Sequence, residues 1–307
     1  MFSLLVFGLF LSAQNYTNAE ENLITTSTGV EMTQSEHDHL QKLGFTDLAI
    51  DQISQDVFEE NKDIVVSDQS EETKYYEIQE VENSDDISSY LLEDEDSNYI
   101  TTELTEDEYF KRVAEQNDEV TTFASSDTTK TSYRRLTTTV SKINKTTARI
   151  HSKFIWDKMP ATRSHDVLST SIKAEFTPVP GSNYAQQLWA YSRPNTGGGL
   201  HGDNASYKSS SSKWNKKAAG YGVKMNLKNN GSNYRVNQLE GYAYYNVKRD
   251  SSVIPKYVNA YGNYSHAKKS VSPSFSYGIS FGGPSLSWSG ISSKSFDTIT
   301  THAQVKY

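Results

Sequence analysis

The second half of the chain alternates between two kinds of side chain, and this alternation constrains the fold more than any other feature. Between residues 219 and 228, Ala, Tyr, Val, Met and Leu alternate with Gly, Lys and Asn. Successive side chains of a β-strand point to opposite faces of a sheet, so the pattern predicts a strand with one buried face. The turn-forming segment 229–233 and the run from Tyr234 that follows it predict an antiparallel hairpin.

Further runs of this kind continue to the end of the chain, and Gly, Pro, Asn or Ser separates most of them. They cover residues 149–157, 166–177, 184–192, 239–248, 257–266, 274–281, 285–288 and 296–307. A series of strands without helical interruption predicts a mainly β fold, an antiparallel β-sandwich or flattened barrel over residues 137–307. Aromatic side chains supply much of the burial in sheet proteins. We expect the core to contain Trp156, Trp189, Trp288, Phe154, Phe176, Phe275, Phe281 and Leu227.

Charge divides the chain at about residue 122. Residues 20–122 contain 30 Asp and Glu against 5 Lys and Arg, a balance of −25. Residues 123–307 contain 8 Asp and Glu against 25 Lys and Arg, a balance of +17. Opposite charges of this size predict two regions with different solvation and different partners, and an intramolecular contact between the acidic and the basic region is one of the expected interactions.

The acidic region has the start signals of helices. A Thr followed three residues later by Glu, at 33–36 and again at 105–108, is typical of a capping box. Apolar spacing after the first box predicts three short helices in a small acidic module over residues 20–64. Residues 65–136 are rich in Glu, Asp and Ser, and their self-repulsion predicts a partly disordered linker with one helix and a Thr/Ser-rich joint.

The first residues predict export. Residues 2–13 form an apolar run that is too short to span a bilayer, and Thr17 and Ala19 are the small residues that precede a cleavage site. We therefore expect a signal peptide over residues 1–19 and a protein that is extracellular or loosely associated with the cell envelope. No later segment resembles a transmembrane helix. The chain has no Cys, which in an exported protein favours a Gram-positive bacterial origin.

The sequence contains no signature of catalysis, cofactor binding or metal binding. Residues 278–282 match the Gly-x-Ser-x-Gly elbow of hydrolases, but an elbow needs a helix after the Ser and this sequence continues as a strand. Residues 94–105 lack the Gly and the bidentate Glu of an EF-hand loop, and residues 196–203 lack the Lys of a phosphate-binding loop. We therefore expect a protein without cofactor or metal that is not an enzyme.

A pair of carboxylates for glycoside hydrolysis stays open as an alternative. The candidate acids of the basic region are Asp157, Asp166, Glu175, Asp203, Glu240 and Asp250. Spacing along the chain does not say which of them approach one another. Alanine substitution of Glu175 and Glu240, with activity measured on polysaccharides, tests this alternative.

Tyrosines interleave with Lys, Arg and Asn between residues 234 and 269. Tyr rings stack on sugars and Lys attracts phosphate or carboxylate, so this face suits an anionic cell-wall polymer or another carbohydrate. The candidate ligand-binding residues are Tyr242, Tyr244, Tyr257, Tyr261, Lys256 and Lys268. The alternative is a solvated sheet with ordinary surface Tyr. An exported protein seldom meets nucleic acid, so we expect no nucleic-acid partner.

The segment 156–166 is the most individual stretch of the chain. Its Pro160 is expected to end a strand, and Arg163 is expected to pair with Asp166 across the following loop. The Trp, Met-Pro, Arg and Asp of this segment, together with Gly44-Phe45, resemble a group of uncharacterised secreted proteins of Bacillus-like Gram-positive bacteria. The resemblance implies export, a helical N-terminal region and an all-β C-terminal domain. It implies no catalytic residue.

Three functions are consistent with these features. The first is a secreted, non-enzymatic β-rich protein that binds anionic cell-envelope polymers. The second is a proprotein, in which the acidic region masks a basic, membrane-active domain until proteolysis near Arg134-Arg135. The third is the polysaccharide hydrolase.

Overall fold

The computed structural model describes residues 23–81, 99–119, 129–193, 199–250, 252 and 254–307. Strands account for 53% of the residues and helices for 14%, which confirms the predicted mainly β fold. The expected signal peptide and the acidic run 93–96 lie outside the described residues.

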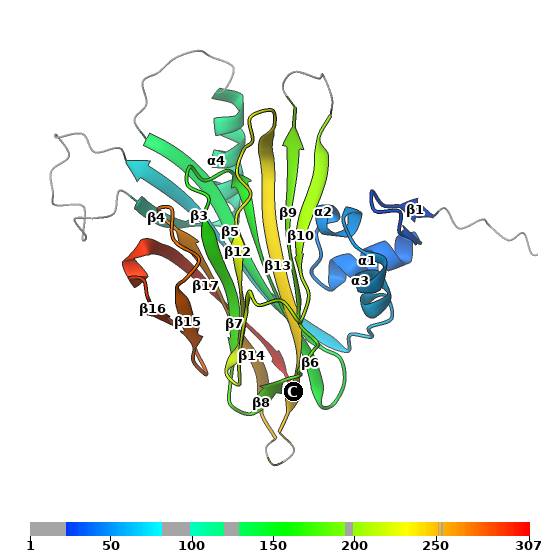
Figure 1. Ribbon diagram of the computed structural model, residues 1–307. Helices are drawn as coiled ribbons and strands as arrows, with labels where there is room; N and C mark the ends of the chain where they lie inside the picture. The colour runs from blue at the N-terminus through cyan, green and yellow to red at the C-terminus, as the bar shows by residue number, and fades with distance from the viewer. Residues whose placement is uncertain (1–22, 82–98, 120–128, 194–198, 251, 253) are drawn as a thin grey trace, which may run out of the picture.

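Two antiparallel sheets pack face to face as a sandwich (Figure 1). The larger sheet contains, in spatial order, β10 (His201–Tyr207), β9 (Tyr184–Ser192), β13 (Arg235–Arg249), β6 (Thr147–Lys158), β5 (Thr129–Lys142), β3 (Asp68–Val81) and β4 (Tyr99–Leu104), with β8 (Phe176–Pro178) beside β13. The smaller sheet contains β11 (Trp214–Lys217), β12 (Gly220–Asn226), β7 (His165–Ile172), β14 (Tyr257–Ala267) and β17 (Phe296–Lys306). The hairpin of β15 (Ser276–Ile279) and β16 (Leu286–Ser289) packs on the outer face of this smaller sheet.

The hairpin expected around residues 229–233 is wrong. β12 pairs with β11 and β7 in the smaller sheet, whereas β13 pairs with β6, β9 and β8 in the larger sheet. The turn therefore carries the chain from one sheet to the other. Periodicity predicts that both strands bury one face, but it does not say which sheet each strand joins.

The core between the sheets is largely the predicted one. Both sheets contribute to it, with Trp156 and Phe154 from β6 packed against Tyr264 of β14. The predicted core residues Trp156, Trp189, Phe154, Phe176, Phe275 and Leu227 are all buried. Phe281 is instead 48% exposed in the turn after β15, and Trp288 on β16 is half-buried. Both belong to the outer hairpin, which has a packed layer on one side only.

The acidic segment expected as a linker over residues 65–136 is partly sheet. β3 pairs with β5 along its whole length, and β4 pairs with β3 on the other side. The all-β body therefore begins at residue 68 and not at residue 137. The helix expected in this segment is confirmed as α4 (Glu106–Glu119), with Thr105 and Glu108 bonded as a capping box.

Donors from the rest of the body stabilise three carboxylates of β3. Glu77 forms an ion pair with Arg112 of α4, and Glu72 accepts a hydrogen bond from the backbone N–H of His302 on β17. Glu71 accepts a hydrogen bond from Thr139 of β5 at 3.0 Å. A carboxylate that finds such donors no longer opposes folding by repulsion, which is why composition alone misassigned this strand.

The N-terminal module is confirmed as helical and includes a short hairpin. It consists of β1 (Ile24–Thr25), β2 (Glu31–Met32), α1 (Gln34–Lys42), α2 (Asp47–Asp51) and α3 (Gln55–Asn61). The first capping box is present, with Thr33 accepting from the N–H of Glu36 at 3.2 Å. Each helix is too short to be stable alone, so the module depends on its packing against the sheet.

The module docks on the outer face of the larger sheet mainly through apolar contacts (Figure 1). Phe45 packs edge-on against Tyr242 and Tyr244 of β13, with ring centroids 5.1 and 6.0 Å apart. Tyr242 and Tyr244 are only 2% and 0% exposed, so their assignment to a solvated, ligand-binding face is wrong. β13 is covered on both faces, so the Tyr residues on its outer face are buried although their alternation in the sequence suggests a solvated face.

Polar contacts fix the position of the module on the sheet. Arg149 of β6, stacked over the Tyr244 ring at 4.4 Å, donates to the side chain of Asn61 and lies 3.6 Å from Glu60. Lys208 forms a second ion pair, with Asp56 at 2.7 Å. The expected contact between the acidic and basic regions is therefore present, but two ion pairs contribute little beside the apolar core of this interface.

Gly44 is the point of closest approach between module and sheet. Its φ is +103°, in the left-handed region, and a Cβ added there would lie 2.7 Å from the ring of His151. We expect Gly44→Ala to lower the free energy of unfolding by about 2 kcal/mol, because backbone strain and the contact with a buried ring add. Gly29 also has a positive φ, of +82°, but open space around it. Gly29→Ala is the matched control, with an expected loss of about 1 kcal/mol in urea denaturation; equal losses would show that the His151 contact is unimportant.

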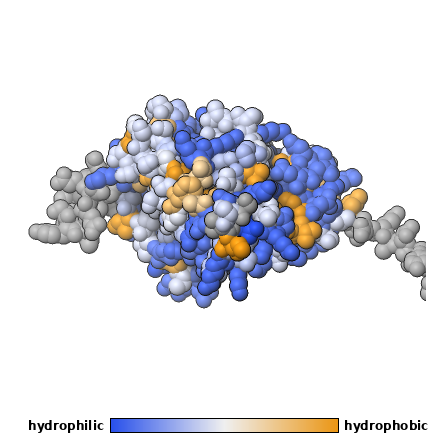
Figure 2. Space-filling view, turned by 90° about the horizontal axis from the view of Figure 1, so that it is seen from below, coloured by the Kyte–Doolittle hydropathy of each residue, from blue (hydrophilic) through white to orange (hydrophobic). Residues whose placement is uncertain are grey.

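Apolar residues are scattered over the described surface. Among the described residues, no helix is both long and apolar enough to cross a membrane. Seen from the end of the sandwich shown in Figure 2, hydrophilic residues dominate and the apolar ones are interspersed among them. Apolar patches that mark large obligate interfaces are continuous, so this face has the character of an ordinary solvated surface.

Candidate functional site

One end of the sandwich has two adjoining hollows surrounded by lysines, which we call the lysine end. The hollows have volumes of about 240 and 360 Å³, and both are lined by Glu80 and Tyr99. Five lysines line them in total: Lys268, Lys269 and Lys294 the first, Lys130 and Lys158 the second. Glu80 is the one acidic side chain among the lining residues, so the positive charge is in excess.

The strand register of the larger sheet brings half of this set together. Glu80 of β3 lies opposite Tyr99 of β4 on one side and opposite Lys130 of β5 on the other. On the next strand, Lys158 ends β6 opposite Tyr133 of β5. These residues therefore come from four neighbouring strands that end at the same edge of the sheet.

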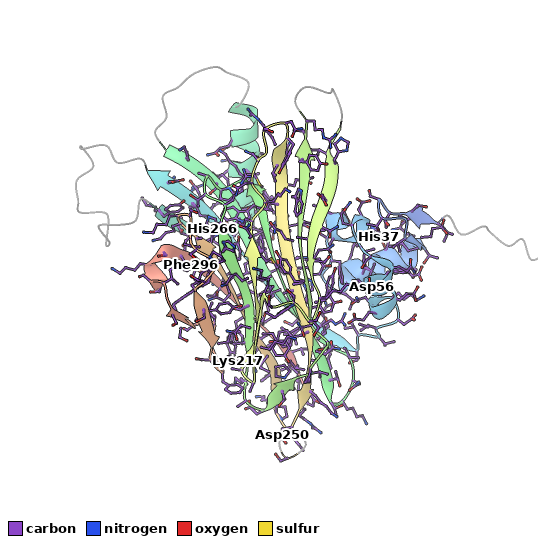
Figure 3. The ribbon with its side chains drawn as sticks, viewed as in Figure 1. His37, Asp56, Lys217, Asp250, His266 and Phe296 are labelled. Carbon is purple, nitrogen blue, oxygen red and sulfur yellow. The ribbon has the colours of Figure 1, made fainter. Side chains whose placement is uncertain are left out.

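The smaller sheet supplies the other half. Lys268 and Lys269 directly follow β14, and Lys294 lies in the short 3₁₀ helix η1 (Ser293–Ser295) that precedes β17. The backbone N–H of Lys268 donates to the carbonyl of Ser295 at 3.0 Å, which holds the two segments together. Figure 3 shows the neighbouring His266 and Phe296 side by side at this end.

The lysines at this end have different environments. Lys269 and Lys294 are exposed, whereas Lys158 is half-buried and donates to Gln116 of α4. Burial raises the pKa of Tyr99, so its hydroxyl remains a neutral hydrogen-bond donor. Exposed lysine side chains beside neutral donors attract phosphate or carboxylate groups without a large desolvation cost.

The structure does not bring the six sequence-predicted ligand residues together. Tyr242 and Tyr244 lie under the helical module. Tyr257 and Tyr261 are half-buried on β14, where Tyr261 stacks on His302 at 4.3 Å. Lys256 is exposed just before β14, near the ring of Tyr257.

Of the six candidates, Lys268 alone lines a hollow of the lysine end. Lys269 lies at the end of the basic stretch expected from the sequence, whereas Lys294 of η1 was not predicted, nor were three residues at strand ends, Tyr99, Lys130 and Lys158. The signal available for these three was their position at strand ends. That signal becomes specific only when the order of the strands in the sheet is known.

The candidate carboxylates are also dispersed, with one exception. Asp157 and Glu240 line the same hollow on the outer face of the larger sheet. Asp166 is fully buried and bonded to Tyr264 and His266, so its expected pairing with Arg163 is wrong.

Arg163 instead donates to the carbonyl of Lys228 and to the side chain of Asn230, both at 3.2 Å. It therefore anchors the crossing segment between the two sheets. No group of His, Asp and Glu among the described residues has the geometry of a metal site.

Comparisons with known proteins add little to this picture. No family model matches the chain, and no curated protein matches it. Among solved structures, the chain is similar to AvmM, described as catalysing macrocyclization in alchivemycin A biosynthesis. The match covers 46% of this chain and 77% of AvmM, with 10% sequence identity and a TM-score of 0.22. A likeness at that level carries no argument about function.

Proposed function

We propose that this chain is a secreted, non-enzymatic binding protein that holds an anionic polymer of the cell envelope at the lysine end. The convergence of five lysines around Tyr99, from strands of both sheets, supports this proposal. A polymer with repeated phosphate or carboxylate groups matches several separate ammonium groups better than one small anion does. Two adjoining hollows also suit successive repeats of a chain.

The position of the helical module is consistent with an accessible site. No residue of the module lines either hollow. The module covers β13 and its neighbours on the outer face, and it does so through apolar packing. Binding at the lysine end therefore does not require release of the module.

Cleavage at Arg134-Arg135, on which the proprotein alternative depends, has no support in the fold. Both residues lie within β5, which is paired with β3 and β6 on its two sides. Arg134 is fully buried, and Arg135 forms an ion pair with Asp157 at 3.0 Å. Proteases act on exposed, extended loops, so this site is protected in the folded protein.

Charge reversal at the lysine end tests the proposal. We expect the double variant Lys269→Glu/Lys294→Glu to bind isolated Gram-positive cell walls about tenfold or more weakly than the wild type, measured by co-sedimentation, because each Lys near an anionic surface contributes about 1 kcal/mol. Both side chains are exposed, so the fold should be retained. Raising the salt concentration should weaken the wild type towards the level of the variant, since exposed charges are screened over about 8 Å at physiological ionic strength.

Lys217→Glu is the matched control. Lys217 is also exposed but lies far down the sandwich from His266 and Phe296 (Figure 3). Its variant should bind walls as the wild type does, apart from the small effect of net charge. Equal weakening by both variants, or wild-type binding that persists in molar salt, would show that the lysine end is not the site.

A further inference from the structure

The outer face of the larger sheet carries a groove beside the helical module, and we propose that this groove binds a neutral carbohydrate. The groove has a volume of about 320 Å³, at the lower end of the range for small-molecule sites. It shares no lining residue with the lysine end. The groove and the lysine end are therefore separate sites, and each can be tested without the other.

The floor of the groove is a row of side chains on three adjacent strands. Glu240 of β13 lies opposite Ile155 of β6, and Ile155 lies opposite Arg135 of β5. Residues in one row of a sheet point to the same face, so all three face the helical side. Asp157 joins them, because its carboxylate accepts from Arg135 Nε at 3.0 Å and from the hydroxyl of Tyr109 on α4 at 2.7 Å.

The start of α2 forms the wall on the other side. Thr46, Asp47 and Leu48 line the groove, and the hydroxyl of Thr46 donates to Oε1 of Glu240. Glu240 is only 9% exposed, and Thr46 is the one side chain among the described residues that donates to its carboxylate. The second oxygen of Glu240 is open to the groove, where a bound hydroxyl group that donates to it takes the place of water.

The charges of the groove favour a neutral ligand. Arg135 and Asp157 compensate each other as an ion pair at 3.0 Å, and the carboxylate of Asp47 is exposed to solvent. Burial raises the pKa of Glu240 to about 7, so near neutrality this side chain is partly a neutral acid that can both donate and accept. Hydroxyl groups also donate and accept, and they match this set.

The shape and apolar content of the groove distinguish a sugar from a peptide. Leu48 and Ile155 are half-buried and offer a small apolar surface, whereas Trp156 and Leu239 are each only 1% exposed. This surface suits the CH face of a sugar ring but is too small for apolar side chains of a peptide. The exposed amide of Gln238 completes the set with both a donor and an acceptor.

Binding of neutral oligosaccharides to the intact protein tests this inference. The probes are the tetramer of N-acetylglucosamine and cellotetraose, with tetra-alanine as the peptide comparison, and binding is measured by titration calorimetry. We expect the wild type to bind at least one of the two saccharides and not tetra-alanine. Gln238→Ala should weaken that binding about three- to tenfold, as the loss of one hydrogen bond predicts.

Two variants make the result specific. The side chain of Gln238 is exposed and makes no hydrogen bond to another described residue, so its substitution should not unfold the protein. Lys269→Glu/Lys294→Glu should leave saccharide binding unchanged, whereas Gln238→Ala should leave wall binding through the lysine end unchanged. The inference is overturned if the wild type binds neither saccharide, if tetra-alanine binds instead, or if Gln238→Ala binds the saccharide as tightly as the wild type.

Discussion

Replacing Asp166 by alanine is expected to lower the free energy of unfolding by about 3–5 kcal/mol, measured by urea denaturation. Asp166 is fully buried on β7 and accepts from three donors of the neighbouring strand β14. These are the hydroxyl of Tyr264 at 2.5 Å, the Nδ1 of His266 at 2.8 Å and the backbone N–H of Ala267 at 3.0 Å. Alanine leaves all three donors in the core without a partner, and each then costs its desolvation energy.

The effect should extend across the sandwich, because Tyr264 links the two sheets. Its hydroxyl also accepts from the indole N–H of Trp156 on β6, at 2.9 Å. Arg134, fully buried on β5 of the larger sheet, lies 5.5 Å from the Tyr264 ring and pairs with Asp297 of the smaller sheet at 2.5 Å. A polar cluster of this kind specifies how the sheets face each other, which apolar packing alone does less well.

Two other substitutions distinguish the effect of leaving buried donors without an acceptor from the effect of removing a negative charge. Asp166→Asn keeps the shape and part of the acceptor capacity, so it should cost less than alanine. Asp250→Ala removes an exposed carboxylate at the lower tip of the molecule (Figure 3), whose partner is Ser252 of the same turn, and should change the free energy by less than about 0.5 kcal/mol. A loss of under about 1 kcal/mol for Asp166→Ala would show that water replaces the carboxylate.

The strands of the basic region were predictable because their period of two repeats over many residues. β9 (Tyr184–Ser192) has the predicted bounds, and β14 and β17 differ from theirs by one residue at the C-terminal end. The pairing of the strands was harder to predict from the sequence. The segment 229–233 has the composition of a hairpin turn, yet it joins strands of different sheets. Local turn chemistry fixes a change of direction and does not fix the partner strand.

The acidic region shows where composition misleads. β3 (Asp68–Val81) contains alternating Tyr and Ile among its acids, but the acids dominate its average character. The donors that make those acids tolerable come from α4, β5 and β17, all distant in sequence. No local window contains that information, so the segment resembles a solvated tract until the fold is known.

The sequence predicts the kind of ligand for the candidate sites but not which residues come together to form them. The positive charge of the basic region predicts an anionic partner, and Lys268 was among the residues predicted to bind it. Tyr242 and Tyr244 were misassigned because the helical module covers β13. The alternation of side chains along a strand does not show whether a second layer packs on its outer face. Asp157 and Glu240 are 83 residues apart in numbering yet line one groove, through strand pairing that spacing does not report.

Glu240→Gln is expected to stabilise the protein at alkaline pH and to remove a pH dependence of about 3 kcal/mol. The pKa of Glu240 rises from 4.5 to about 7, and burial is the largest cause. Thr46, Lys153 and Arg135 act in the opposite direction and Asp157 in the same one, so burial outweighs the nearby positive charge. One pKa unit corresponds to about 1.4 kcal/mol, from which the expected size follows.

The sign of the effect comes from proton binding. Between its unfolded and folded pKa values, Glu240 is more protonated in the native state than in the unfolded state, so the native state loses stability as the pH rises. The contribution is fully present below about pH 4.5 and is lost as the pH passes through about 7. Glutamine does not titrate, so the difference in unfolding free energy between variant and wild type should grow over this interval and then level off.

The module helps to bury this carboxyl, and Thr46 of the module donates to it, so the cost of the buried charge should be felt first at that interface. Above about pH 7 we expect amide hydrogens of α2 and α3 to exchange faster in the wild type than in Glu240→Gln, relative to amides of the core strand β14. Glu31→Gln is the matched control, since Glu31 is an exposed carboxyl of the same module on β2. The opposite outcome is a difference in exchange rate between the wild type and Glu240→Gln that stays the same at every pH. It would mean that Glu240 ionises in the folded protein as an ordinary glutamate, and that water reaches it through the groove.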